Sequence, residues 1–264
     1  MSGMSAPAFA APENPQMRTR LIWEVAIVLC LSLGKSALYS VLSFVRVQLS
    51  PTPISEQTAQ LNPTRDDQAV WDVIYGILDV FFDLALVALV IYLMWEPGKS
   101  VLRRIGLDFS RFGSDFLRAL AIGAVIGIPG LGLYLVGRML DLSIAVQASD
   151  GIPWYLIPVL LLSAARAGLV EEVIMLAYLG DRLRRLGGGA WTIVLSAAAL
   201  RGLYHAYQGL PGIIGNFVMG VVFGWAYQRW GRVMPLVIAH TLIDIVAFVG
   251  YPLAATLYPT LFPA

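Results

Sequence analysis

Long apolar runs alternate with short polar segments along this chain. Runs that approach the roughly 20 apolar residues needed to cross a bilayer predict membrane helices. The expected helices cover about 18–47, 71–95, 116–140, 153–185, 190–207, 211–229 and 233–251. An apolar stretch in 252–264, interrupted by Pro259, leaves room for an eighth, short span. No run has the alternating pattern of a strand, so we expect an all-α, polytopic transmembrane bundle of seven or eight spans.

Polar segments divide the chain into predicted units. Residues 1–17 are rich in Ala, Pro and Ser and are expected to form a disordered tail. N-terminal membrane helices follow over 18–152, a second helical unit over 153–251, and a C-terminal segment over 252–264. The run 153–185 would be roughly 48 Å long as one straight helix. We therefore expect it to tilt, to bend near Gly168, or to project from the bilayer.

Composition supports the membrane assignment. Hydrophobic residues make up 58% of the 264 residues and charged residues 13%, against about 45–50% and about 25% in soluble domains. A formal net charge of +1 gives no electrostatic reason to expect nucleic acid as a partner. Cys30 is the single cysteine, which excludes an intrachain disulfide framework.

Basic residues gather in every second loop. They are Arg18, Arg20, Lys99, Arg103, Arg104, Arg111, Arg182, Arg184, Arg185, Arg229 and Arg232. The alternate loops hold little positive charge, and Arg65 in one of them is offset by Asp66 and Asp67. By the positive-inside rule, this distribution fits seven spans with a cytoplasmic N-terminus.

Ionisable residues inside the predicted spans of the second half are the candidate functional groups. They are Glu171, Glu172, Arg201, His205, His240 and Asp244, and they include both histidines of the chain. A charged group near mid-membrane costs roughly 2.5–3.5 kcal/mol on insertion scales and marks a functional site by default. Depths counted from the helix ends bring these residues to similar levels, so we expect one polar cavity.

Helical geometry suggests separate roles for the two glutamates. Neighbouring helical residues point about 100° apart, so Glu171 and Glu172 are not expected to address one point. Small residues, Ala164 and Gly168, precede Glu171 and would let another helix approach closely. His240 and Asp244 are four residues apart and share a helix face, so Asp244 could orient His240, or both could contact one ligand.

A carboxylate with two histidines is suited to hydrolysis. Glu171 could act as the general base for water, with His205 and His240 donating hydrogen bonds to the developing oxyanion. Alternatively, Glu171, His205 and His240 could hold a Zn²⁺ that activates the water.

Three ordered motifs carry a family resemblance. "EEVIMLAYLGDRLRRLG", "LRGLYHAYQG" and "GRVMPLVIAHTLID" resemble the patterns EExxxR, FxxxH and HxxxN or HxxxD of the CPBP intramembrane metalloproteases. That family includes CAAX prenyl endopeptidases and proteins of bacteriocin self-immunity. The resemblance covers about 153–250 and makes 153–251 a CPBP-like catalytic core.

The resemblance implies an endopeptidase that cleaves a peptide or membrane-protein substrate at the lipid bilayer. We expect a multi-pass protein of a bacterial plasma membrane with its N-terminus in the cytoplasm. Carried over, the first Glu is Glu171, which activates water, and the second is Glu172. The histidines are His205 and His240, and the last polar position is Asp244. The family is called a metalloprotease family, yet the resemblance implies hydrolysis more firmly than an obligatory zinc.

Two residues depart from the family pattern. Leu176 stands where the family has Arg, and Arg201 stands where it has Phe. We therefore expect Arg201, from the next helix, to pair with Glu172. The departures also keep an alternative function open: a catalytically inactive membrane scaffold or bacteriocin-immunity protein that binds a partner through the same cavity.

Overall fold

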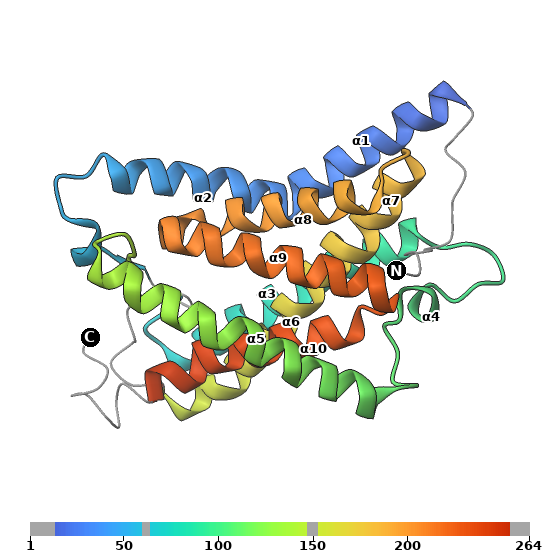
Figure 1. The fold of residues 1–264 in the computed structure, drawn as a ribbon. Helices are drawn as coiled ribbons and strands as arrows, with labels where there is room; N and C mark the ends of the chain where they lie inside the picture. The colour runs from blue at the N-terminus through green and yellow to red at the C-terminus, as the bar shows by residue number, and fades with distance from the viewer. Residues whose placement is uncertain (1–13, 60–63, 147–152, 254–264) are drawn as a thin grey trace.

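The computed structural model describes residues 14–59, 64–146 and 153–253, and these are helical almost throughout (Figure 1). The α-helices are α1 Pro15–Leu31, α2 Leu33–Gln48, α3 Ala69–Leu93, α4 Val101–Ile105, α5 Phe112–Met139, α6 Ile157–Glu172, α7 Leu179–Arg185, α8 Ala190–Tyr204, α9 Leu210–Trp230 and α10 Met234–Ile245. Shorter helical turns are η1 Ile54–Glu56, η2 Trp154–Leu156, η3 Val173–Tyr178, η4 Ala206–Gln208 and η5 Val246–Gly250. The predicted all-α class is confirmed. One short parallel pair, β1 Thr58–Ala59 with β2 Ala145–Val146, was not predicted.

Fewer helices of the described chain are long and apolar enough to cross a membrane than the seven or eight spans predicted from the sequence. Within the described residues, four helices are long and apolar enough to cross a membrane: Ala69–Leu93, Phe112–Met139, Leu210–Trp230 and Met234–Leu253. A bent pair, α1 with α2, raises the count to five. Taken alone, α6 and α8 have 16 and 15 residues and are not counted, although α6 continues through η3 into α7. The count of seven or eight spans therefore stays a prediction.

The first predicted helix is two helices. The angle between α1 and α2 is 54°, and the break lies at Ser32, whose hydroxyl donates to the Val28 carbonyl oxygen at 2.6 Å. At the other end, Asn14 caps α1 by accepting a hydrogen bond from the backbone N–H of Gln16. The last three residues of the predicted tail, 15–17, are thus helical, while 1–13 lie outside the described residues.

The long predicted helix 153–185 is continuous but irregular. It begins with η2 and α6, passes through the π-helical turn η3, and ends as α7. In η3 the backbone N–H of Leu179 donates to the carbonyl oxygen of Ile174, five residues earlier. The irregularity therefore lies directly after Glu172, rather than near Gly168. Single π-helical turns inside α-helices occur frequently at functional sites.

Close packing holds α6 against α10. A Cβ atom on Gly168 would lie 2.7 Å from Thr241 Oγ1 and 2.8 Å from the Val237 carbonyl oxygen, so only glycine permits this approach. The helix α3 packs on α6, and α8 runs along both α2 and α9 (Figure 1). The C-terminal end of α6 is consequently enclosed by α8 and α10, which positions its two glutamates in the interior.

An ion-pair group of Glu96, Lys99, Arg104 and Arg185 connects the segment that follows α3 to the end of α7. The carboxylate of Glu96 accepts hydrogen bonds from Lys99 at 2.9 Å, Arg185 at 2.9 Å and Arg104 at 2.7 Å. These three cations lower the pKa of Glu96 from 4.5 to about 2, Lys99 contributing most.

We expect this ion-pair group to make stability depend on pH in the acid range. Because the folded-state pKa of Glu96 is depressed, its contribution is present above about pH 4.5 and is lost as the pH falls toward about 2. Between about pH 5 and about pH 3, thermal unfolding in detergent should show a larger fall in Tm for the wild type than for Glu96→Gln. Equal falls in Tm would contradict this role.

Candidate active site

The candidate residues come from three helices that meet inside the bundle. Glu171 and Glu172 end α6, His240 and Asp244 lie on α10, and Arg201 lies in the last turn of α8. The side chains of Glu172, Arg201 and His240 are almost completely buried. The structure therefore brings five of the six ionisable candidates into one cluster.

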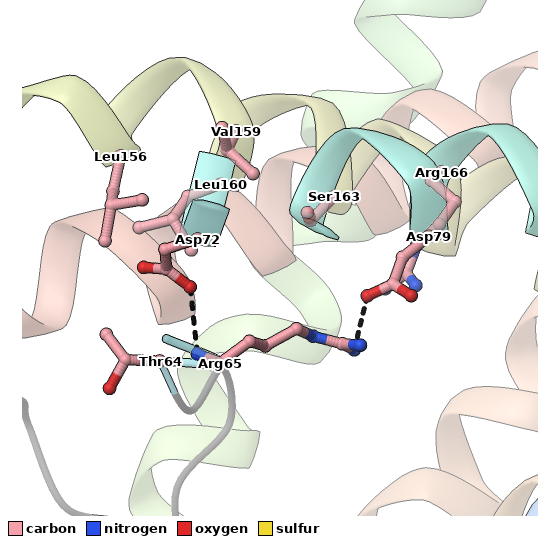
Figure 2. A pocket seen from close by; sticks show the side chains of 10 residues that line it. Thr64, Arg65, Asp72, Asp79, Leu156, Val159, Leu160, Ser163 and Arg166 are labelled. Atoms are coloured by element: carbon pink, nitrogen blue, oxygen red, sulfur yellow. Dashed lines mark hydrogen bonds and ion pairs between the residues drawn. The ribbon is translucent and has the colours of Figure 1, made fainter. Parts of the chain in front are cut away.

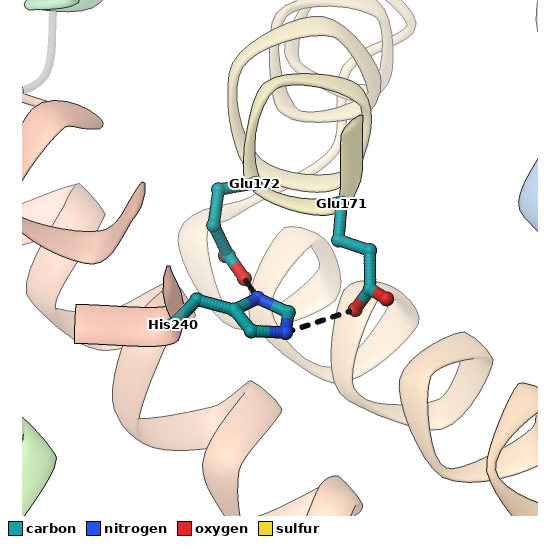
Figure 3. A group of neighbouring side chains, drawn as sticks. All are labelled: Glu171, Glu172 and His240. Carbon is teal, nitrogen blue, oxygen red and sulfur yellow. Dashed lines mark hydrogen bonds and ion pairs between the residues drawn. The ribbon is translucent and has the colours of Figure 1, made fainter. Parts of the chain in front are cut away.

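The imidazole of His240 lies between the two glutamates (Figure 3). Its Nδ1 forms a hydrogen bond with Glu172 Oε1 at 2.6 Å, and its Nε2 lies 3.7 Å from Glu171 Oε2. The two acids thus contact separate atoms, as expected, but these atoms belong to one imidazole ring. They diverge along the helix, but an imidazole carries nitrogens at two edges of its ring, so each acid meets one of them.

Arg201 neutralises Glu172 from α8. Its Nη2 donates a hydrogen bond to Glu172 Oε1, and its Nη1 lies 3.8 Å from Glu171 Oε2. The guanidinium also lies over the ring of Phe223, 5.3 Å from the ring centre. Leu176, in η3, is buried and offers Glu172 no charge. The structure thus contains the predicted contact between Arg201 and Glu172.

Asp244 lies near the other edge of His240. Its Oδ2 is 3.5 Å from Nε2, whereas Glu172 approaches Nδ1 within 2.6 Å. Glu172, rather than Asp244, is therefore the closer orienting partner of the imidazole. Asp244 and Glu171 both flank Nε2 and leave it facing the space between them.

Tyr204 is a member of the cluster that the sequence reasoning missed. Its hydroxyl donates a hydrogen bond to Glu171 Oε2. A signal was present in the sequence, because Tyr204 follows Arg201 by three residues and therefore shares its helix face. The same face of α8 delivers one donor to each glutamate.

His205 lies at the edge of the cluster, close enough to interact electrostatically with Glu171. It directly follows α8, is partly exposed, and its ring centre lies 4.7 Å from that of Tyr204 and 6.2 Å from that of Tyr207. Arg201 and Tyr204 occupy the face of α8 toward α6, and the next residue points about 100° away. The predicted zinc set of Glu171, His205 and His240 therefore stays a prediction, beside the group of Glu171, Glu172 and His240.

The metal-capable group in the described part of the chain is Glu171, Glu172 and His240. One potential ligand atom from each lies within 4.8 Å of the others. Of the Glu172 carboxylate, Oε1 is engaged by Arg201 and His240, while Oε2 is buried and has no hydrogen-bond partner in the protein. The oxygen and nitrogen donors fit a Zn²⁺ site.

Other buried polar atoms around the cluster also have no hydrogen-bond partner in the protein. They are Arg201 Nη1 and His205 Nδ1. Buried polar groups in native proteins are almost always hydrogen-bonded, to protein or to ordered water. These atoms therefore mark where water, or polar atoms of a ligand, can be held.

A mainly apolar groove of about 400 Å³ lies between α5, α9 and α10. Its wall includes Met219 and Ile243, which lie one helical turn from Phe223 and His240 respectively. The ring of Phe223 contacts His240 edge-on, with ring centres 6.4 Å apart. The groove therefore passes beside the cluster and can accept an apolar segment.

The fold and the cluster define a helical membrane protein whose buried glutamate–histidine site is suited to hydrolysis. Residues 153–246 match the family model of Rce1-like proteins, described as type II CAAX prenyl endopeptidase. The match includes all of the candidate residues, and the predicted resemblance to the CPBP family is confirmed over it. The family points to a CAAX-type intramembrane protease. Neither a curated protein nor a solved structure matches the chain significantly.

Proposed function

We propose that this protein is an intramembrane endopeptidase, with 153–251 as its catalytic core and Glu171 as the base that activates water. The observation that carries the proposal is the imidazole of His240 held between Glu171 and Glu172 (Figure 3). The match to a protease family supports the reaction class. The experiment that tests it is the loss of peptide cleavage on Glu171→Gln.

Glu171 has the surroundings that a general base requires. Its Oε2 accepts a hydrogen bond from Tyr204 and lies 3.7 Å from His240 Nε2. A water about 2.8 Å from each atom would bridge that separation. Attack of this water on a peptide carbonyl transfers its proton to Glu171, which then donates it to the leaving amine.

With both ring nitrogens protonated, His240 would stabilise the tetrahedral intermediate by donating a hydrogen bond from Nε2. Glu172 accepts at Nδ1 and so fixes the ring orientation, and Arg201 holds Glu172 in turn. Asp244, 3.5 Å from Nε2, helps to hold the ring position. His205, with its buried Nδ1 lacking a protein partner, would be a second donor to the oxyanion.

The donor set also fits a divalent metal held by Glu171, Glu172 and His240. A bound Zn²⁺ would lower the pKa of its water and polarise the carbonyl. Arg201 already compensates Glu172, so the cluster can hold its acids together without the metal. Hydrolysis by Glu171 and His240 is therefore compatible with a site in which zinc is not obligatory.

Zinc binding should distinguish the two histidines. We expect Zn²⁺ titration of the purified, metal-stripped protein to give binding that His240→Ala abolishes and His205→Ala leaves nearly unchanged. The reason is that His240, and not His205, lies with Glu171 and Glu172. Isothermal titration calorimetry on the three proteins checks this. Equal loss in both variants would restore the set that the sequence suggested.

The apolar groove supports a hydrophobic peptide or membrane-protein segment as substrate. Such a segment would reach the cluster laterally from the bilayer, through the gap between α5, α9 and α10. The excess of Arg and Lys in alternate loops supports a cytoplasmic N-terminus. We further propose a bacterial plasma membrane as the location. Glycosylation or protease-protection mapping of the termini would test that orientation.

A further inference from the structure

A polar pocket of about 180 Å³ lies between α3 and α6, apart from the apolar groove (Figure 2). Its wall includes Arg65, Asp72 and Asp79 on one side and Ser163 and Arg166 on the other. None of its lining residues belongs to the groove between α5, α9 and α10. The proposed reaction gives this pocket no role.

Charged side chains follow one face of α3 beside the pocket. Asp72, Asp79 and Asp83 follow at spacings of seven and four residues, which places them on one helix face. Arg65 pairs with Asp79, and Arg166 Nη1 donates to Asp83 Oδ2 at 2.8 Å. Charged groups inside a membrane span face the bundle interior or a water-filled cavity, because lipid does not solvate them.

The helix α6 leads from this pocket toward Glu171. Its stripe Ala164, Gly168 and Glu172 packs on α10, and the two side chains of that stripe are completely buried. The neighbouring stripe, Ser163, Ala167 and Glu171, stays partly exposed. From Ser163 in the pocket wall to Glu171 is about 12 Å along the helix, and the intervening Ala167 is small.

Two buried polar atoms without a hydrogen-bond partner lie in residues of α6, one in the pocket wall and one in the cluster. Arg166 Nε, at the pocket, and Glu172 Oε2, at the cluster, are buried and have no hydrogen-bond partner in the protein. Arg166 is also close enough to interact electrostatically with Asp244. Ordered water satisfies such atoms in polar, roomy sites. Sites that can hold ordered water therefore occur both at the pocket and at the cluster.

We propose that this pocket and the stripe Ser163–Ala167–Glu171 form a water inlet to the active site. Water reaches Glu171 between α3 and α6, from the membrane face where Arg65 lies. The substrate segment occupies the separate apolar groove. The use of this water in hydrolysis rests on the proposed function. The water path itself does not, and thiol accessibility measures it without a cleavage assay.

Thiol accessibility tests the path. In a Cys30→Ser background, Ser163→Cys and Ala167→Cys should react rapidly with a small, charged methanethiosulfonate reagent. The matched control Leu162→Cys, exposed on the same helix, should react at least about tenfold more slowly, because thiolates form poorly in lipid. Equal rates at 162, 163 and 167, or no reaction at both 163 and 167, would overturn the inlet.

A second variant tests whether the water is used. Ala167→Leu should lower kcat for peptide cleavage roughly tenfold with an unchanged KM, because it obstructs water and not substrate. The control Ala85→Leu, exposed on α3, should leave both constants unchanged. An unchanged kcat for Ala167→Leu overturns the supply role. If the wild type cleaves no peptide, the proposed function fails, while the thiol rates still decide whether the inlet exists.

Discussion

Replacement of Glu171 by Gln is expected to abolish peptide cleavage, with a loss in kcat of about 10²–10⁴-fold. An amide cannot take a proton from water, yet its oxygen still accepts the hydrogen bond of Tyr204. The substitution therefore removes the base with little change in shape. Cleavage of a peptide library by purified protein in detergent, read by mass spectrometry, measures the effect.

The control is Glu56→Gln, which makes the same change at an exposed residue outside the cluster and should cleave like the wild type. Two results would count against the proposal. Undiminished cleavage by Glu171→Gln would remove Glu171 from the reaction. No cleavage by the wild type, together with retained binding of a protein partner, would favour the membrane scaffold or bacteriocin-immunity alternative.

Arg201→Leu should have the largest effect on stability. Both partners of this ion pair are buried, and removal of one partner from a buried pair costs about 3–5 kcal/mol, because the other charge is left uncompensated. Glu172 would then lose the contact that fixes it under His240. We expect a lower Tm in detergent and loss of cleavage.

Adding Leu176→Arg to the Arg201→Leu protein should restore part of its stability and part of its cleavage activity. Position 176 follows Glu172 by four residues on the same helix, so a guanidinium there can reach the carboxylate. Restoration is expected to be partial because 176 lies in the π-helical turn η3, where residues four apart are less well aligned than in an α-helix. Arg229→Leu, at an exposed arginine, is the matched control. Normal activity and stability in Arg201→Leu would refute the compensation by Arg201.

Most helices of this fold were predictable from apolar runs, because lipid and bundle interior both demand apolar side chains. The interruptions were not. Ser32 breaks the first run through a side-chain hydrogen bond to Val28, which composition does not reveal. Likewise, residues 173–178 contain neither Gly nor Pro, so the sequence of η3 does not indicate a π-helical turn.

Contacts between residues on one helix face were predictable from the sequence. The position of the His240 ring relative to the two glutamates was less so. The spacing of His240 and Asp244, and the exchange of Leu176 and Arg201 against the family pattern, led to contacts that the structure contains. The placement of one imidazole against both glutamates depends on how α10 approaches α6, which the sequence does not specify. Tyr204 was overlooked because a tyrosine near a helix end is usually an interfacial anchor.

The π-helical turn η3 also changes the direction in which side chains point after it, relative to those before it. Before it, Glu171 and Glu172 face α8 and α10. After it, Arg182 Nε donates to Glu24 at 2.7 Å and its Nη2 to the Leu93 carbonyl oxygen at 2.7 Å. Deleting one residue of η3 would turn everything beyond it by about 100°, and Arg182 would lose both partners. The extra residue of η3 thus allows the glutamates to face the cluster while Arg182 on α7 reaches Glu24 and Leu93.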